Sequence, residues 1–344
     1  MKLRLLLLAV LLGTASWLAV TWSGRADSVS THRYVSTPID HRTHITEATQ
    51  LARTARTEND GLHSDGIDPH ALYLPVSPRP VDAGAQAVVS SPSAITLPDG
   101  MRFYHGDLHS HTSYSDGKGT PQEAFEMARS YGLDFFTVTD HAYMLNDTEW
   151  ADVRAQAREA TTNGEFIGLY GYEWTSNNGH INIFNTSKLV KATDRDYDTA
   201  EELYAWLSKP AQVNTIAQFN HPFYPPDSFN SLQYKRLADR HMFLMEIHDG
   251  NALRTDKFNE GLEVGWRVAP TDNSDAHWQT WGMKRGRNGI IAPALTYHHI
   301  INALRARRTF ATQDENLVLA LRADDNWMGS VIRNGPVHFD VYAS

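Results

Sequence analysis

The sequence predicts an α/β fold, on three observations. Short apolar runs rich in β-branched and aromatic residues, typical of buried strands, occur at 133–138, 166–170 and 213–219. Segments with helical spacing lie between these runs. Polar residues of metal-binding types follow the runs, at the strand ends where a parallel α/β barrel holds its active site.

The first expected helix has the clearest boundaries. Thr120 is a suitable N-cap, Pro121 fits the first helical position, Glu123 completes a capping box and Gly132 ends the segment. Three further segments show the same periodicity: 149–162, 199–207 and 297–307. The alternation of strands and helices is typical of right-handed βαβ units.

The densest candidate site follows the start of this region. Asp107, His109 and His111 alternate with Leu108 and Ser110, so an extended chain places them on one face. Two adjacent imidazoles suit Zn, Mn, Fe or Co better than Ca or Mg. The segment therefore predicts a transition-metal site.

Further candidate ligands follow the later strands, which makes a pair of surface histidines a poor explanation. The nine candidates are His109, His111, Asp116, His141, Glu173, His180, His221, Asp275 and His277. This number exceeds the needs of one structural zinc, and the chain has no cysteine for a closed thiolate site. We therefore expect a catalytic cluster in which two metals activate a bridging water as the nucleophile. Asp107 and Asp140 are expected to hydrogen-bond the ligands instead of binding metal.

The ordered motifs carry a resemblance to a known family. Asp-Leu-His-Ser-His at 107–111, Thr-Asp-His at 139–141, Glu173, Asn-His-Pro at 220–222 and Ser-Asp-Ala-His at 274–277 resemble the PHP superfamily of polymerase and histidinol-phosphatase metallohydrolases. The match covers roughly residues 103–313. Segments around Glu173 and at 308–312 resemble the branch that contains carbaryl-type carbamate hydrolases.

The resemblance implies a distorted (β/α)7 barrel with a small C-terminal β appendage and with two or three divalent ions, Mn, Zn or Fe. It assigns the ligands as follows: His109, His111, Glu173 and Asp275 to the first metal, Glu173, His180 and His221 to the second, and Asp116, His141 and His277 to the third. Glu173 would bridge the first two, and Glu173, Asp275 and His277 would be catalytic. Many family members have a histidine in place of Asp116, so we expect the third site to be the weakest.

Three functions stay open on the residues alone. A phosphoesterase acting on a small-molecule ester would use cations such as Arg285 and Arg287 to bind the phosphate. A carbamate or carboxylic-ester hydrolase would use the same metals with an apolar pocket, for which Phe223, Tyr224, Trp278 and Trp281 are candidates. A metal-binding scaffold without turnover is the alternative of another class.

The amino terminus predicts export. Lys2 and Arg4 precede an apolar run at 5–20, and small residues follow at 23–26. Residues 1–26 are therefore expected to be a signal peptide or a single membrane anchor, with the rest periplasmic or extracellular, or held at the inner membrane.

The remaining domains follow from composition. Residues 27–100 are expected to be extended, 101–313 to form the barrel, and 314–344 to begin a small β unit that is truncated or borrows a pairing strand. The 344 residues, 41% hydrophobic, suffice for one substantial core. The net charge of −9 argues against a nucleic-acid-binding surface. The absence of cysteine excludes a disulfide scaffold and a lipid-modified cysteine anchor.

Overall fold

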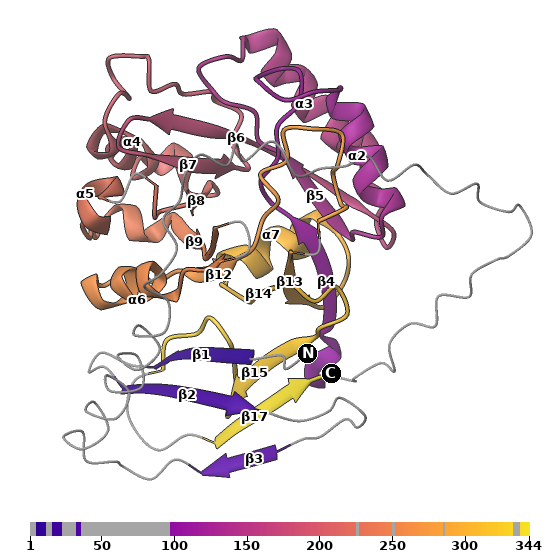
Figure 1. Ribbon diagram of the computed structural model, residues 1–344, viewed down its shortest axis with the longest axis vertical. Coiled ribbons are helices and arrows are strands. Elements are labelled where there is room, and N and C mark those ends of the chain that lie inside the picture. The colour runs from indigo at the N-terminus through magenta and orange to yellow at the C-terminus, as the bar shows by residue number, and fades with distance from the viewer. Residues whose placement is uncertain are drawn as a thin grey trace, which may run out of the picture. The chain divides into compact units, whose positions relative to one another are not determined.

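A computed structural model describes three N-terminal strands and most of the chain from residue 97 onward (Figure 1). The strands are β1 (Leu5–Leu11), β2 (Ser16–Trp22) and β3 (His32–Val35). Residues 97–344 are described except 225–226, 250–251, 285 and 333–337. The chain divides into two compact units, 1–34 with 95–344 and 35–94, and the second lies outside the described residues apart from Val35.

A nine-stranded sheet forms the centre of the first unit. In spatial order its strands are β12 (Ala269–Thr271), β9 (Met242–Glu246), β8 (Ile216–Asn220), β7 (Gly179–Phe184), β6 (Ile167–Ser176), β5 (Phe135–Val138), β4 (Arg102–Asp107), β13 (Arg287–Ala292) and β14 (Thr309–Thr312). The Thr309 hydroxyl donates to the Pro270 carbonyl at 3.0 Å, which links the two end strands. The sheet is thus nearly closed, and the predicted α/β barrel is confirmed.

The barrel is distorted by its antiparallel strands. Strands β4, β5 and β6 run parallel to one another, as do β8, β9 and β12. Strand β7 pairs antiparallel with both β6 and β8, and β13 pairs antiparallel with β4 and β14. The β6–β7 hairpin brings two candidate ligands together without an intervening helix.

The helices largely match the expected segments. The structure has α2 (Pro121–Ser130), α3 (Asp147–Ala160), α4 (Ala200–Leu207), α5 (Ser228–Leu232), α6 (Thr255–Val264) and α7 (Tyr297–Arg305), with 3-10 turns η1 (Pro98–Gly100), η2 (Pro210–Gln212) and η3 (Ala238–Arg240). Helix α2 has the predicted capping box between Thr120 and Glu123. Helices α2 and α3 pack beside β5 and β6 (Figure 1).

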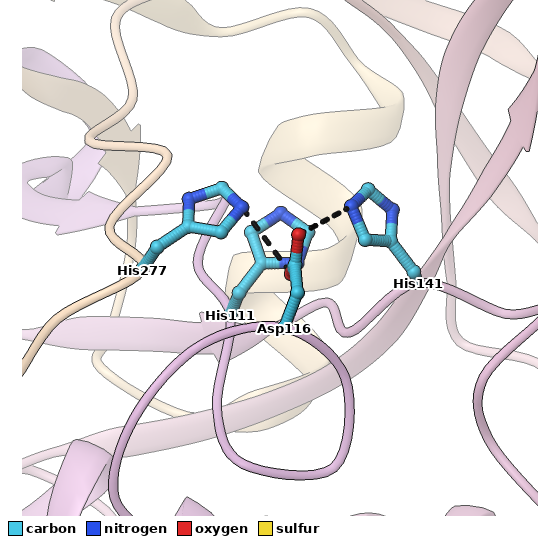
Figure 2. Close-up of side chains that lie close together, drawn as sticks. All are labelled: His111, Asp116, His141 and His277. Carbon is cyan, nitrogen blue, oxygen red and sulfur yellow. Dashed lines mark ion pairs between the residues drawn. The ribbon is translucent and has the colours of Figure 1, made fainter. Parts of the chain in front are cut away.

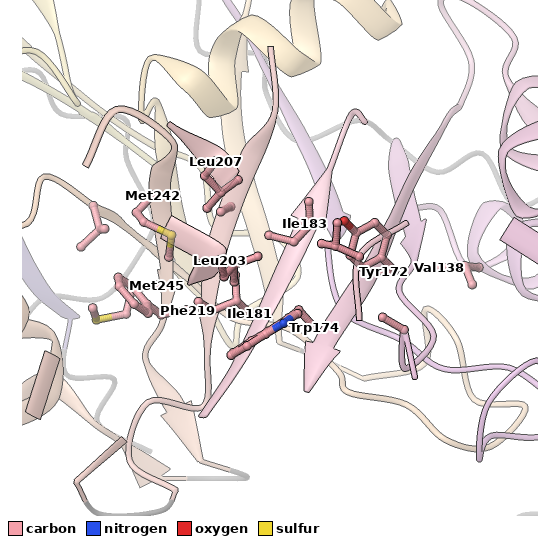
Figure 3. Close-up of a cluster of buried hydrophobic side chains, with 14 of the residues drawn as sticks. Val138, Tyr172, Trp174, Ile181, Ile183, Leu203, Leu207, Phe219, Met242 and Met245 are labelled. Carbon is pink, nitrogen blue, oxygen red and sulfur yellow. The ribbon is translucent and has the colours of Figure 1, made fainter. Parts of the chain in front are cut away.

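The core lies between the strands and α4 (Figure 3). Trp174 of β6 and Ile181 of β7 are fully buried there, as are Phe219 of β8 and Met242 of β9. Leu203 of α4 packs into the same cluster. This apolar layer fixes the strands whose ends carry the candidate ligands.

A second, four-stranded sheet contains the C-terminal strands. Its order is β16 (Asn326–Trp327), β15 (Leu319–Ala323), β17 (His338–Ala343) and β3. Strands β15 and β17, which pair antiparallel, lie within the small β unit expected at 314–344. Strand β3 comes from the N-terminal region and supplies a pairing partner at the edge of this sheet. A separate two-stranded ribbon joins β10 (His248–Asp249) to β11 (Ala252–Leu253).

The predicted signal or anchor segment contains β1 and β2, which pair antiparallel from Leu5 opposite Trp22 to Leu11 opposite Ser16. Among the described residues, no helix has the length and apolar character needed to cross a membrane. Export and the four domain boundaries stay predictions.

Candidate metal centre

Eight of the nine candidate ligands lie on or shortly after strands of the barrel, and Asp116 lies in the loop between β4 and α2. His109 and His111 follow β4, His141 follows β5, Glu173 lies on β6, His180 on β7, His221 follows β8, and Asp275 and His277 follow β12. The structure brings them into three groups whose ligand atoms lie within 4.8 Å of one another: His109 with His111 and Asp275, Glu173 with His180 and His221, and His111 with Asp116, His141 and His277. These groups differ from the three sets implied by the resemblance at two points: Glu173 is not in the first group, and His111 belongs to both the first and the third. The assignment of these residues to metals stays a prediction.

Glu173 lies at the centre of the three groups and is 1% exposed. Its two carboxylate oxygens face five imidazole nitrogens. Oε1 lies 3.2 Å from His109 Nε2, 3.2 Å from His180 Nδ1 and 3.5 Å from His221 Nε2, and Oε2 lies 2.7 Å from His141 Nδ1 and 3.7 Å from His111 Nε2. This arrangement suits a carboxylate that bridges two metals.

The first group has a donor set that fits a divalent cation. The Nε2 atoms of His109 and His111 lie 3.2 Å apart. Asp275 Oδ1 lies 3.2 Å and 3.0 Å from these two nitrogens. This oxygen is buried and has no hydrogen-bond partner among the described residues. A cation between these three atoms would satisfy them all.

The third group is more open. Asp116 lies between two histidines, with Oδ1 3.3 Å from His277 Nε2 and Oδ2 3.5 Å from His141 Nε2 (Figure 2). The side chains of Asp116 and His277 are 45% and 33% exposed, whereas that of His109 in the first group is fully buried. A metal held here would therefore have more contact with solvent than one held by His109 and His111.

The buried charges shift the pKa values of His109 and Glu173 in opposite directions. Burial lowers the pKa of His109, but the carboxylates of Asp275, Glu246 and Glu173 outweigh it and hold that pKa well above its usual value. Burial raises the pKa of Glu173, but its imidazole partners, led by His109, hold it well below its usual value. Both shifts favour a charged pair of His109 and Glu173, and a metal bound at His109 would compete with a proton on that imidazole.

Glu246, the last residue of β9, was missed by the sequence analysis. Its Oε1 accepts a hydrogen bond from His109 Nδ1 at 2.9 Å, and its Oε2 accepts from the His221 backbone N–H at 2.6 Å. Glu246 thus orients residues of two different metal groups. The sequence feature that could have revealed Glu246 is the apolar run Met-Phe-Leu-Met at 242–245, which this carboxylate follows directly.

Asp107 and Asp140 bind backbone and hydroxyl groups. Asp107 Oδ1 accepts from the N–H groups of His109 at 3.2 Å and Ser274 at 3.1 Å, and burial raises the pKa of Asp107 to about 6. Asp140 accepts from the Thr112 N–H at 2.7 Å and the Ser115 hydroxyl at 2.5 Å. These carboxylates hold the loops that carry the ligands.

The backbone at two candidate ligands is strained. Asp275 has a φ of 47° and His221 a φ of 28°, both in the left-handed region that non-glycine residues rarely adopt. Strain of this kind is concentrated at functional sites, where the surrounding structure maintains it.

Of the two predicted phosphate-binding cations, Arg287 has another partner, as does Lys284, which precedes Arg285 in the sequence. Arg287 Nη2 lies 3.5 Å from Glu315, and Lys284 Nζ lies 3.4 Å from Asp272. Arg285 lies outside the described residues. Lys118 is next to the third group, because its N–H donates to the His277 carbonyl at 3.0 Å.

The predicted apolar pocket residues divide into two pairs. Phe223 and Trp281 are buried, and Trp281 Nε1 donates to the His111 carbonyl at 3.2 Å. Tyr224 and Trp278 are 73% and 58% exposed. Only the second pair is free to meet a substrate from solvent.

The PHP domain profile matches residues 107–224. This segment includes His109, His111, Asp116, His141, Glu173, His180 and His221. A search of curated proteins finds no match to the chain.

Three solved structures resemble the chain. A two-domain protein from Bacteroides vulgatus, containing a predicted PHP-like metal-dependent phosphoesterase, is 16% identical with a TM-score of 0.51, over 72% of this chain and 89% of its own. A protein from Bifidobacterium adolescentis, provisionally named a metal-dependent phosphoesterase, is 13% identical with a TM-score of 0.33, over 52% and 88%. An amidohydrolase from Chromobacterium violaceum is 14% identical with a TM-score of 0.30, over 50% and 87%. The first of these shares the fold of this chain.

Proposed function

We propose that the PHP domain of this chain is a metal-dependent hydrolase that cleaves phosphoesters of small molecules. The observation that carries this proposal is the convergence of five imidazole nitrogens on the two oxygens of Glu173. Hydrolytic enzymes often hold two metal ions close together, and a carboxylate placed like Glu173 could be a ligand of both. The phosphoesterase description of the Bacteroides vulgatus protein supports the choice of substrate class.

Each group of residues has a part in the reaction. Two or three divalent ions, Mn, Zn or Fe, would supply Lewis acidity and an activated water when bound. His109, His111 and Asp275 would hold the first ion, His180 and His221 the second, and Glu173 would be shared between them. Asp116, His141 and His277 would hold the third.

Two further residues, Glu246 and Lys118, would assist the candidate ligands. Glu246 accepts the Nδ1 proton of His109, which leaves Nε2 of that ring free to bind a metal. Lys118 Nζ lies 5.9 Å from the ring centre of Trp278, the residue after His277, so this ammonium could pair with a non-bridging phosphate oxygen as charge develops there.

A carbamate or carboxylic-ester hydrolase is the second candidate. Exposed aromatic side chains lie next to the ligands: Trp278 directly follows His277, and the ring of Tyr143 lies 5.4 Å from that of His141. Such rings would suit an aryl leaving group, as in the carbaryl-type branch. The complete ligand set argues against a scaffold without turnover.

Metal analysis followed by a substrate screen tests the proposal. The purified protein should contain at least two equivalents of Mn, Zn or Fe. It should hydrolyse an aryl phosphate faster than a matched aryl carbamate or carboxylic ester, and a chelator should abolish the activity. Faster turnover of the carbamate would favour the second candidate. Bound metal without turnover of any ester would favour the scaffold.

A further inference from the structure

A polar cavity of about 630 Å³ lies at the turn that joins β6 to β7. Its volume is in the range of small-molecule binding sites. The groups that line it include Thr175, Asn177, Asn178, Thr193, Asp198 and Asn230.

Thr175 connects this cavity to the metal centre. Thr175 is one of the residues that line the cavity, and its hydroxyl lies 2.8 Å from His141 Nδ1 and 3.4 Å from Glu173 Oε2. A substrate whose reacting group lies at Glu173 could therefore extend past Thr175 into the cavity.

The lining is rich in neutral hydrogen-bonding groups. Three asparagine amides, each with donors and an acceptor, combine with the hydroxyls of Thr175, Ser176, Thr193 and Thr199. No Lys, Arg or His is among the described residues that line the cavity. A second anionic group would find no opposite charge there.

The carboxylates of the lining do not make it a strong cation site. Glu201 lies 3.4 Å from Lys235, an ion pair at the surface. Asp198 is the other lining carboxylate, and it is exposed. Hydroxyl groups, which both donate and accept, match the amides and hydroxyls better than an ammonium group does.

The wall that carries the asparagines is built by a close approach of two turns. Gly179 has a φ of +134°, and a Cβ there would lie 2.4 Å from the Phe229 ring. The Phe229 N–H donates to the Asn178 carbonyl at 2.7 Å, and residues 229–232 have left-handed φ values of 52–55°. As a result, Asn230 faces Asn178, with 3.5 Å between Oδ1 and Nδ2.

One lining acceptor lacks a partner. Asn178 Oδ1 is buried and accepts no hydrogen bond from the described residues. A buried acceptor of this kind is costly unless a donor reaches it. A hydroxyl group in the cavity would supply that donor.

We propose that this cavity binds the uncharged, hydroxyl-rich part of the substrate, a sugar or polyol whose phosphoester lies at the metal centre. The inference rests on the proposed function, because the phosphoester defines which end of the substrate reaches Glu173. Asn178 and Asn230 are its main specificity residues.

Kinetics with paired substrates test this. Asn178→Ala and Asn230→Ala are each expected to raise KM for glucose 6-phosphate about 5- to 10-fold, as expected for loss of one hydrogen bond, with little change for phenyl phosphate. Asn163→Ala is the matched control, since Asn163 is an exposed asparagine in the turn before β6. Equal effects on both substrates, or a preference of the parent enzyme for phenyl phosphate, would overturn the inference.

A binding measurement separates this inference from the proposed function. Saturation-transfer NMR with D-glucose, which has no phosphate, should detect binding to the parent protein and a weaker signal with Asn178→Ala or Asn230→Ala. Glucose binding without hydrolysis of either phosphate would contradict the phosphoesterase and retain the hydroxyl-binding cavity. Phenyl phosphate hydrolysis without glucose binding, or binding of putrescine in place of glucose, would refute the cavity assignment.

Discussion

Glu246 accepts a hydrogen bond from His109 Nδ1 at 2.9 Å, so a buried carboxylate outside the three candidate groups fixes the orientation of a candidate ligand. The same residue binds the backbone of His221 through its second oxygen. A single change at Glu246 therefore affects ligands of two groups.

Glu246→Gln should weaken metal binding about 10- to 100-fold, because an amide no longer fixes the protonated Nδ1 of His109 as a carboxylate does. Titration against a competing chelator measures this affinity. Glu263→Gln, at an exposed position of α6, is the matched control. Unchanged affinity in Glu246→Gln would refute the orienting role.

Glu173→Gln should abolish turnover while the circular dichroism spectrum stays that of the parent. An amide cannot balance two divalent cations as a carboxylate does. Retention of most of the parent activity with excess metal would rule out the bridging role.

Asp116→Ala and His109→Ala should differ in metal content. Because Asp116 belongs to the open third group, its loss should remove part of the metal and lower turnover, whereas His109→Ala should lose the first metal and nearly all activity. Metal analysis of both purified variants provides the comparison. Equal losses would mean that the groups do not bind metal separately.

Asp134→Asn should stabilise the protein more at pH 8 than at pH 4. Burial raises the pKa of Asp134 from 3.8 to about 6, so the folded state binds its proton more tightly than the unfolded state. Its contribution to stability is therefore lost as the pH rises from about 4 to 6. The gain from the substitution should grow over this interval by at most about 3 kcal/mol.

Denaturant unfolding at the two pH values measures the effect of Asp134→Asn. The amide oxygen can still accept the His105 N–H, which lies 2.7 Å from Asp134 Oδ2. Asp325→Asn, at a side chain that is 99% exposed, should show no such dependence. A gain that is the same at pH 4 and pH 8 would contradict the buried-charge explanation.

The full-length chain should cross the inner membrane of a bacterial host, since a basic start precedes the apolar run at 5–20. Cell fractionation combined with N-terminal sequencing tests this. A cleaved product should begin near Asp27, and an anchored one should stay with membranes and be cut by external protease within 27–100. A protein that stays in the cytosol with Met1 still attached would contradict both the signal-peptide and the membrane-anchor predictions.

The sequence predicted those helices and strands whose positions depend on neighbouring residues, through helix caps and apolar runs. The capping residues Thr120 and Glu123 defined the start of α2, and the apolar runs located β5 and β8. The ligand motifs could be found because polar metal-binding residues follow apolar runs.

Features that depend on distant contacts could not be predicted in this way. The antiparallel pairing of β7 with β8 joins strands that residues 185–215 separate in the sequence, and β9 has no β-branched residue to mark it as a strand. For that reason Glu246 was overlooked. The partners of Asp107 and Asp140 are loop N–H groups, whose directions appear only in the folded chain.

The β6–β7 hairpin makes the alignment of the metal centre a matter of strand register. Thr175 pairs with His180, so His180 lies on the face that carries Glu173, while Trp174 pairs with Ile181 on the opposite, buried face. Because side chains alternate, a slip of β7 by one residue would turn Ile181 toward the Glu173 face and His180 away from it. The burial of Trp174 and Ile181 on the opposite face therefore fixes the register that holds His180 beside Glu173.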